Sequence, residues 1–164
     1  VVTALLVWAT WGSLQHAGAA HDERAYLLQA RIFALGKWVA AAPPLPEFFV
    51  QLHVIVSPVL AAKYPPGHSL LLIPGVLVGL PGLMPVVLSG IAGGLLFALV
   101  RRVTDPWVAL LAWLFWVTAD DNLRWRASYY SEVTTSVTVL LAWWSAPRAA
   151  RTAHSKPAEH AHTA

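Results

Sequence analysis

An uncharged apolar run from Pro85 to Val100, ending at Arg101-Arg102, constrains the fold of this chain most strongly. Hydrophobic residues make up 57% of its 164 residues and charged residues only 12%, against about 25% charged residues in an average soluble domain. A membrane-spanning helix needs roughly 20 predominantly apolar residues. The run and the composition together predict an all-α integral membrane protein.

Three further stretches are apolar enough to be predicted as spans, which gives about four transmembrane helices in total. They are Val1 to about Ala20, Pro106 to Ala119, and about Glu132 to Trp144. The short turn Val103 to Asp105 predicts a tight hairpin between the spans on either side of it. A cleaved signal peptide is the alternative for the first stretch, because Ala17-Gly18-Ala19 resembles a small-residue cleavage site.

Positive charges predict the orientation in the membrane, because Lys and Arg concentrate on the cytoplasmic side. They flank the hairpin turn and fill the C-terminal tail, so both are expected in the cytoplasm of a protein of the cell's inner or plasma membrane. Residues 1–145 then form the transmembrane region, and residues 146–164 a disordered, basic, His-containing cytoplasmic tail. Two loops face outward, Ala20 to about Met84 and Asp120 to Ser131, and the active face is extracytoplasmic.

The first outer loop has structure of its own. Asp22 to Trp38 has the pattern of an amphipathic helix lying in the membrane interface. The Pro-rich stretch Ala40 to Pro46 cannot continue a helix, and short extended pieces are expected at 48–50 and 53–56. Pro65 to Leu80 is apolar but too short to span, which predicts a re-entrant helix that lines a protein cavity.

The acidic residues indicate where chemistry would take place. The predicted topology puts six of the eight on the outer face, namely Asp22, Glu23, Glu47, Asp120, Asp121 and Glu132. Carboxylates beside a bilayer are costly to desolvate, so such a group indicates a site that binds a cation, takes up a proton or orients a polar substrate. Solvated loop charges matched by nearby Lys and Arg are the alternative.

Several motifs follow one another in a recognisable order. The pair Asp22-Glu23 precedes an interfacial helix with a Y-x-x-x-A-R core at Tyr26 to Arg31, then K-Y-P-P-G-H at Lys63 to His68, Arg101-Arg102, and S-Y-Y-S-E at Ser128 to Glu132. In this order they resemble the N-terminal part of the GT-C superfamily of integral-membrane glycosyltransferases, in the protein mannosyltransferase and aminoarabinose transferase-like branch.

The resemblance implies transfer of a sugar from a polyprenyl-phosphate donor to an acceptor on the extracytoplasmic face. Asp22 would be the general base, and Glu23 would orient the acceptor or support the start of the helix. Glu132 would belong to a second acidic motif, in which Tyr130 replaces the family's aspartate; no metal ligand is assigned, and a divalent cation stays open as cofactor. The donor phosphate and substrate would be bound by Arg24, Lys63, Tyr64, His68, Arg124 and Arg126.

The chain is predicted to have fewer spans than the enzymes it resembles. Three interpretations follow: a fragment of such an enzyme, one chain of a split enzyme whose partner supplies the missing helices, or an inactive remnant that keeps the fold. A non-catalytic membrane component that binds or transports a solute is the alternative from another class. The expected partners are membrane lipid and the polyprenyl-phosphate-sugar donor, and no nucleic acid is expected.

Overall fold

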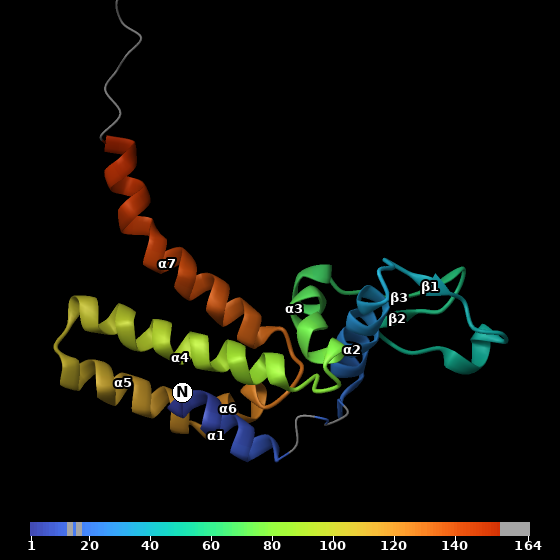
Figure 1. Cartoon of the computed structure of the whole chain (residues 1–164), viewed down its shortest axis with the longest axis horizontal. Helices are drawn as coiled ribbons and strands as arrows, with labels where there is room; N and C mark the ends of the chain where they lie inside the picture. The colour runs from blue at the N-terminus through green and yellow to red at the C-terminus, as the bar shows by residue number, and fades with distance from the viewer. Residues whose placement is uncertain (13–14, 16–17, 155–164) are drawn as a thin grey trace, which may run out of the picture.

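The computed structural model describes residues 1–12, 15 and 18–154, and most of them are helical (Figure 1). Each helix starts or ends at a residue that suits a helix terminus. Asp105, for example, caps α5 by accepting the backbone N–H groups of Trp107 and Val108 at 2.8 and 3.1 Å. The helices are α1 Val2–Trp11, α2 His21–Ala34, α3 Pro66–Leu77, α4 Leu83–Val103, α5 Pro106–Thr118, α6 Asp120–Arg126 and α7 Glu132–His154.

A small antiparallel sheet lies between α2 and α3 in the sequence. Its strands β1 (Ala40–Ala41), β2 (Val54–Ile55) and β3 (Val59–Ala62) are ordered β1-β3-β2. The register pairs Ala40 with Leu60, and Val54 with Ala62. A single turn of 3₁₀ helix, η1 Pro46–Phe49, lies in the connection between β1 and β2.

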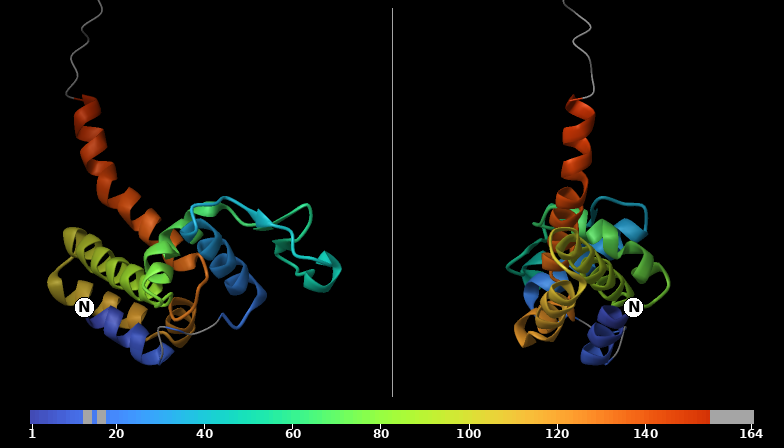
Figure 2. Two further views of the ribbon diagram at one scale, coloured as in Figure 1. Left: turned by 45° about the vertical axis from the view of Figure 1, so that its right-hand side comes forward. Right: turned by 90° about the vertical axis from the view of Figure 1, so that its left-hand side faces the viewer.

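The long helix α4 is the centre of the helical bundle. It packs against α1, α5 and α7, whereas α2 packs mainly on α3 and β3. Figure 1 and the left-hand view in Figure 2 place α2, α3 and the sheet beyond the N-terminal end of α4. Arg101 and Arg102 lie at the opposite end of α4.

Two buried clusters correspond to these two parts. One joins α2, α3 and the segment before α7 through Tyr26, Leu27, Ala30, Leu72 and Tyr129. The other joins α4 and α7 through Leu88, Ala92, Val133 and Val137. The packing of the second cluster holds the start of α7 close to α4, and the first holds α2 close to residue 129.

The prediction of an all-α fold with about four transmembrane helices is wrong. Within the described residues, α4 is the one helix that is both long and apolar enough to cross a membrane, and the fold includes a three-stranded sheet. At 1.5 Å per residue α4 is about 32 Å long, close to the roughly 30 Å of a hydrocarbon core. Its mean hydropathy is 2.3 over an 18-residue window, of which 28% is buried.

Each of the other predicted spans fails for a local reason. α1 stops at Trp11 because Gly12 adopts the left-handed conformation with φ of 72°, so α1 is only about 15 Å long. Part of that predicted span, at 13–14 and 16–17, lies outside the described residues, as does part of the alternative cleavage site. α5 has 13 residues and ends at Thr118. α7 is long enough, but its sequence becomes polar towards the C-terminus, with Arg148 and Arg151, so it lacks the apolar content required.

Several element boundaries agree with those expected from sequence. α4 and α5 form a hairpin around Thr104 and Asp105, and α7 begins at Glu132. Helices occupy the stretches predicted to be interfacial and re-entrant, as α2 and α3, and α3 continues through Pro74. The predicted tail from residue 146 begins inside α7, whereas residues 155–164 lie outside the described part of the chain.

The contact between α1 and α4 gives a first prediction. A Cβ built on Gly93 would overlap the hydroxyl of Thr3, a buried side chain that accepts a hydrogen bond from Trp113 Nε1 at 3.0 Å. A Cβ on Gly94 would meet nothing within 4 Å. We expect Gly93→Ala to destabilise the protein by about 1–3 kcal/mol through overpacking. Gly94→Ala should be neutral or stabilising by up to about 1 kcal/mol, and thermal unfolding in detergent measures both.

Equal melting temperatures for Gly93→Ala and Gly94→Ala would contradict the packing of α1 on α4. The two substitutions add the same atom to neighbouring positions of one helix, so their difference isolates the contact with Thr3 from any general effect on helix propensity.

Candidate functional site

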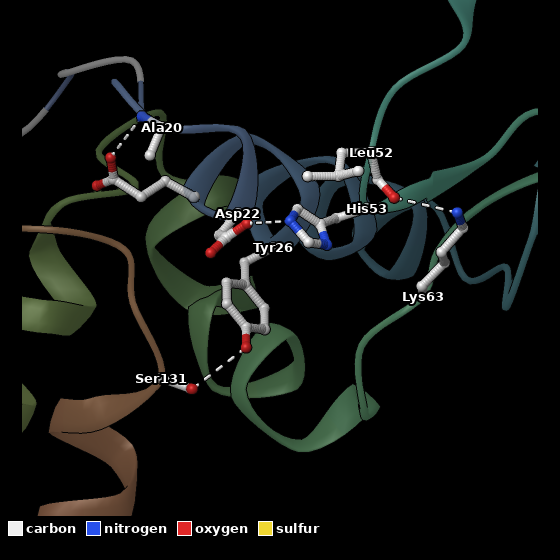
Figure 3. A network of polar contacts seen from close by, with 8 residues as sticks. Ala20, Asp22, Tyr26, Leu52, His53, Lys63 and Ser131 are labelled. Carbon is white, nitrogen blue, oxygen red and sulfur yellow. Dashed lines mark hydrogen bonds and ion pairs between the residues drawn. The ribbon is translucent and has the colours of Figure 1, made fainter.

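The carboxylate of Asp22, in the first turn of α2, pairs with the imidazole of the residue directly before β2. His53 Nε2 lies 2.7 Å from Asp22 Oδ1, and the two side chains are 29% and 35% exposed, respectively. Figure 3 shows the other carboxylate oxygen of Asp22 directed away from His53. Asp22 is therefore held by a partner while it remains accessible to solvent.

Three aromatic rings lie in a row beside this pair. The ring of His53 stacks on Tyr64 at 5.1 Å between centroids, and Tyr64 stacks on Tyr26 at 4.6 Å. Burial, a hydrogen bond to Asp22 and the negative charge of that carboxylate raise the pKa of Tyr64 to about 12. The Tyr64 hydroxyl thus stays protonated beside Asp22 over the whole physiological range of pH.

The β2–β3 hairpin determines which residues meet Asp22. The backbone N–H of Lys63 donates to the carbonyl of His53 at 3.0 Å, so these two residues are cross-strand neighbours and Tyr64 follows directly. Gln29 of α2 fixes the hairpin to the helix: its amide Oε1 accepts the N–H of Ala62, and its Nε2 donates to the carbonyl of Trp38, each at 2.8 Å.

Glu23 differs from its neighbour Asp22 in burial and in its hydrogen-bond partners. Its side chain is 4% exposed, and its carboxylate accepts three backbone N–H groups, from Ala19 at 2.9 Å, Ala20 at 3.0 Å and Tyr129 at 2.9 Å. Ala20, the residue preceding α2, has no side-chain acceptor of its own, so Glu23 supplies the capping interaction. Glu23 therefore joins the start of α2 to the segment before α7.

His68, in the first turn of α3, is also a structural residue. Its Nε2–H donates to the carbonyl of Tyr129 at 2.8 Å, and its Nδ1 accepts the hydroxyl proton of Thr134 at 2.7 Å. Of the two neutral tautomers, only the Nε2–H form satisfies both bonds, because the Tyr129 carbonyl can only accept. Burial lowers the pKa of His68, against the opposing effect of the Tyr129 carbonyl, so the ring is neutral in the folded protein.

The predicted cationic residues do not converge on Asp22. Arg24 Nε donates to the carbonyl of Gly18 at 2.9 Å, and Lys63 Nζ donates to the carbonyl of Leu52 at 3.0 Å (Figure 3). Arg124 forms an exposed i,i+4 pair with Asp120. Lys63 is the one of these three that adjoins the His53–Tyr64 hairpin.

Arg126 serves to end a helix. Its guanidinium is 5% exposed and donates to the carbonyls of Asn122, Trp116 and Val117 at 2.8, 3.0 and 3.3 Å. It also lies 3.9 Å over the Trp116 ring. Burial lowers the pKa of Arg126 to about 10. Two of these bonds satisfy carbonyls in the last turn of α5, and no acid within the described residues forms an ion pair with Arg126.

Glu132 is exposed at the start of α7, next to Tyr130. Burial and the charges of Glu23, Asp22 and Glu132 raise the pKa of Tyr130. In the described part of the chain, no three His, Cys, Asp or Glu side chains are close enough together to hold a metal ion. Glu132 thus acts, together with Asp22 and Glu23, on the Tyr130 hydroxyl, and it belongs to no such group of metal ligands among the described residues.

A cavity of about 240 Å³ opens beside Tyr26 of α2, next to the starts of α3 and α7. The Tyr26 hydroxyl donates to Ser131 Oγ at 3.2 Å at its edge, as Figure 3 shows, and hydroxyl groups from α7 line it further. Its lining residues are Tyr26, Pro65, Gly67, His68, Ser131, Thr134 and Thr135. Hydroxyl-rich walls of this kind suit a polar or hydroxylated ligand.

Comparison of the chain with protein-family models, curated proteins and solved structures finds no match. The chemistry has to be inferred from the site alone. Sequence analysis missed His53, because its pairing with Asp22 depends on a hairpin register that joins segments 31 residues apart. It also missed Tyr26 as the ring that connects Tyr64 with the hydroxyl-lined cavity.

The contrast between the two neighbouring acids gives a second prediction. Glu23→Gln replaces an acceptor of three N–H groups by an amide whose NH₂ cannot accept, and it should destabilise the protein by about 1–3 kcal/mol. Asp22→Asn keeps a hydrogen-bonding group in a half-exposed position and should cost less than about 1 kcal/mol. Denaturant unfolding of both variants in detergent measures the difference, and a larger loss for Asp22→Asn would contradict the assignment.

The neutral state of His68 gives a third prediction. Because its folded-state pKa is lowered, the unfolded chain binds more protons below the unfolded pKa of about 6.5. The stability contributed by neutral His68 is therefore present above pH 6.5 and lost as pH falls, by up to about 1.4 kcal/mol per pH unit. Unfolding free energies between pH 7.5 and pH 5 should fall more steeply for the wild type than for His68→Gln. Parallel curves would contradict a buried neutral His68.

Proposed function

We propose that this chain is the N-terminal part of a GT-C-like membrane glycosyltransferase and that Asp22 is its general base. The observation that carries the proposal is the division of roles in the Asp22-Glu23 pair. Glu23 is buried and saturated by backbone N–H groups, whereas Asp22 is accessible, oriented by His53 and flanked by tyrosine rings. Of the two acids, only Asp22 has an oxygen positioned to take a proton from a bound acceptor.

The proposed reaction needs a general base. As the acceptor hydroxyl or amine attacks the anomeric carbon, its proton passes to the Asp22 carboxylate while the bond between that carbon and the carrier phosphate breaks. Proton transfer to a positioned side chain contributes typically about 10² to 10⁴ in rate. The His53 N–H holds the carboxylate in place, and the Tyr64 hydroxyl, protonated at physiological pH, adds a second donor.

The hydroxyl-lined cavity supports a sugar as ligand. Ser131, Thr134, Thr135 and Tyr26 bring hydroxyl groups from α7 and α2 to one place, next to the ring stack that ends at His53. The hydroxyl protons of Tyr26, Thr134 and Thr135 are donated within the protein, so their oxygens are left to accept from sugar hydroxyl groups. Lys63, on the exposed side of the same hairpin, is the cation best placed to contact a donor phosphate.

Membrane attachment through α4 is part of the proposal. A soluble core helix of its hydropathy would be mostly buried, whereas only 28% of its apolar window is. Neighbouring α5 also exposes large apolar side chains, including Trp107, Leu111 and Phe115. The site lies beyond the end of α4 that is remote from Arg101-Arg102, and by the positive-inside rule that end is extracytoplasmic.

The fourth prediction is that the chain transfers sugar from polyprenyl-phosphate-linked donors and that this transfer depends on Asp22. A transfer assay tests it directly. The full chain is placed in nanodiscs and assayed alone and with membrane extract that can supply a partner chain. Asp22→Asn should lower transfer by at least about 10²-fold. His53→Gln, which keeps an N–H donor, should lower it less than His53→Ala.

Glu47→Gln is the matched control, because it removes an exposed carboxylate in η1 away from the His53 pair. It should transfer sugar like the wild type. Equal loss in Glu47→Gln and Asp22→Asn would contradict a specific role for Asp22. Absence of transfer by the wild type, with and without extract, would overturn the proposal in favour of a binding component or an inactive remnant.

A further inference from the structure

A groove of about 410 Å³ opens between α4 and α7 on the side of the molecule remote from Asp22. The two helices are packed through Leu88, Ala92, Val133 and Val137 near the start of α7, and they diverge beyond these residues (Figures 1 and 2). The walls of the groove are apolar except at Arg102. They comprise Leu96, Leu99, Val100, Arg102, Val103, Leu140, Trp143 and Ala146.

Arg102 lies where the groove meets the end of α4. Its guanidinium is 3.1 Å from the centroid of the Trp144 ring, and its Nη1 donates to the carbonyl of Trp144 at 3.3 Å. These contacts fix the side chain across α4 and α7 and engage few of its five N–H donors. Arg102 is therefore oriented and still able to bind an anion.

The positive charge at this end is not compensated by the acids that the structure describes. Neither Arg101 nor Arg102 forms an ion pair with a described residue. Asp105, the nearest acid in the sequence, uses its carboxylate to cap α5. Arg101 is exposed beside Arg102. The end of the groove thus combines the cationic side chain of Arg102 with a hydrocarbon-like wall, and the exposed Arg101 adds a second positive charge beside it in the sequence.

We propose that this groove binds one acyl chain of an anionic phospholipid whose phosphate contacts Arg101 and Arg102. From Arg102 back to Leu96, six residues of α4 correspond to about 9 Å, which lies below the headgroup level if α4 spans the bilayer. The apolar walls match a hydrocarbon chain, and the two arginines match a net negative headgroup. The proposal rests on the membrane placement of α4 in the proposed function, and it does not depend on sugar transfer.

A zwitterionic headgroup fits this end of the groove less well, because its own cation would approach Arg101 and Arg102. A juxtamembrane Lys or Arg near an anionic surface contributes about 1 kcal/mol, which is about fivefold in affinity. A specific lipid site therefore binds an anionic lipid more tightly than a zwitterionic one, whereas ordinary lipid contact along α4 shows no such preference.

The fifth prediction is that an anionic lipid binds next to Trp143 in preference to a zwitterionic one. Quenching of Trp143 fluorescence by lipids brominated in the acyl chain measures it. The full chain in mixed micelles is titrated with brominated phosphatidylglycerol and, separately, brominated phosphatidylcholine. Phosphatidylglycerol should quench at lower mole fraction, and Trp143→Phe should remove that lipid-specific part of the signal. Arg101→Gln and Arg102→Gln should each reduce the preference about fivefold.

Arg102→Gln also removes the contact with Trp144, so its effect on lipid preference could come from a change in packing. Two further variants test the groove and the charge separately. Ala146→Phe narrows the groove without touching either arginine and should weaken quenching by phosphatidylglycerol. Arg124→Gln removes a positive charge from an exposed pair in α6 and should leave the preference unchanged. Loss of the preference in Arg124→Gln would overturn the site in favour of general charge attraction.

The remaining outcomes separate this proposal from the proposed function. Equal quenching by both lipids would overturn the lipid site while leaving α4 in the membrane. Absence of quenching by either lipid would overturn both the site and the membrane placement of α4. Protection of Trp143 that depends on protein concentration would overturn the lipid as occupant and assign the groove to a second copy of the chain.

Discussion

The buried carboxylate of Glu23 is the interaction on which the candidate site depends. It gathers N–H groups from two segments more than 100 residues apart, the turn at Ala19-Ala20 and the backbone of Tyr129. An ionised group so deeply buried is tolerated because three donors replace its hydration. By fixing the first turn of α2 against the start of α7, it also fixes the adjacent Asp22 above Tyr26 and Ser131. One acid is buried so that its neighbour can be held in place.

The boundaries of α4, α5 and α7 were predictable because local signals mark them: an uncharged run closed by Arg101-Arg102, an Asp105-Pro106 start, and Glu132 opening a Thr-rich helix. The number of membrane-spanning helices was not predictable in this way. Summed hydropathy continues past Gly12, whereas the backbone of Gly12 ends α1. Of the sheet, only β2 lies in a stretch that was expected to be extended, 53–56. The expected piece at 48–50 overlaps η1 instead. Strands of two to four residues show no alternation, and the Ala-rich β1 and β3 pair through contacts across 20 residues.

The candidate site was predicted only in part. The motif residues Asp22, Glu23, Tyr64 and His68 do gather around α2 and α3. Which of the two acids is buried and which is accessible could not be read from their neighbouring positions in the sequence, because burial depends on the packing of α2 against residue 129. Arg126 resembled a phosphate ligand in the sequence and instead binds the carbonyls that end α5. His53 had no motif to mark it. Its position follows from the hairpin register, which is a property of pairing between strands rather than of neighbouring residues.

Gln29 connects the sheet to α2 with a single buried amide, since it binds both Ala62 and Trp38. The chain between these two anchor points passes through η1, where Phe48 is 78% exposed and makes up part of an apolar tip with Phe49 and Val50. Both ends of the segment from Trp38 to Ala62 are hydrogen-bonded to Gln29 of α2. The tip of this segment can therefore change in length or composition without moving the carboxylate of Asp22. Divergence among related chains is therefore expected to concentrate at residues 44–50, where a change of sequence leaves the site around Asp22 in place.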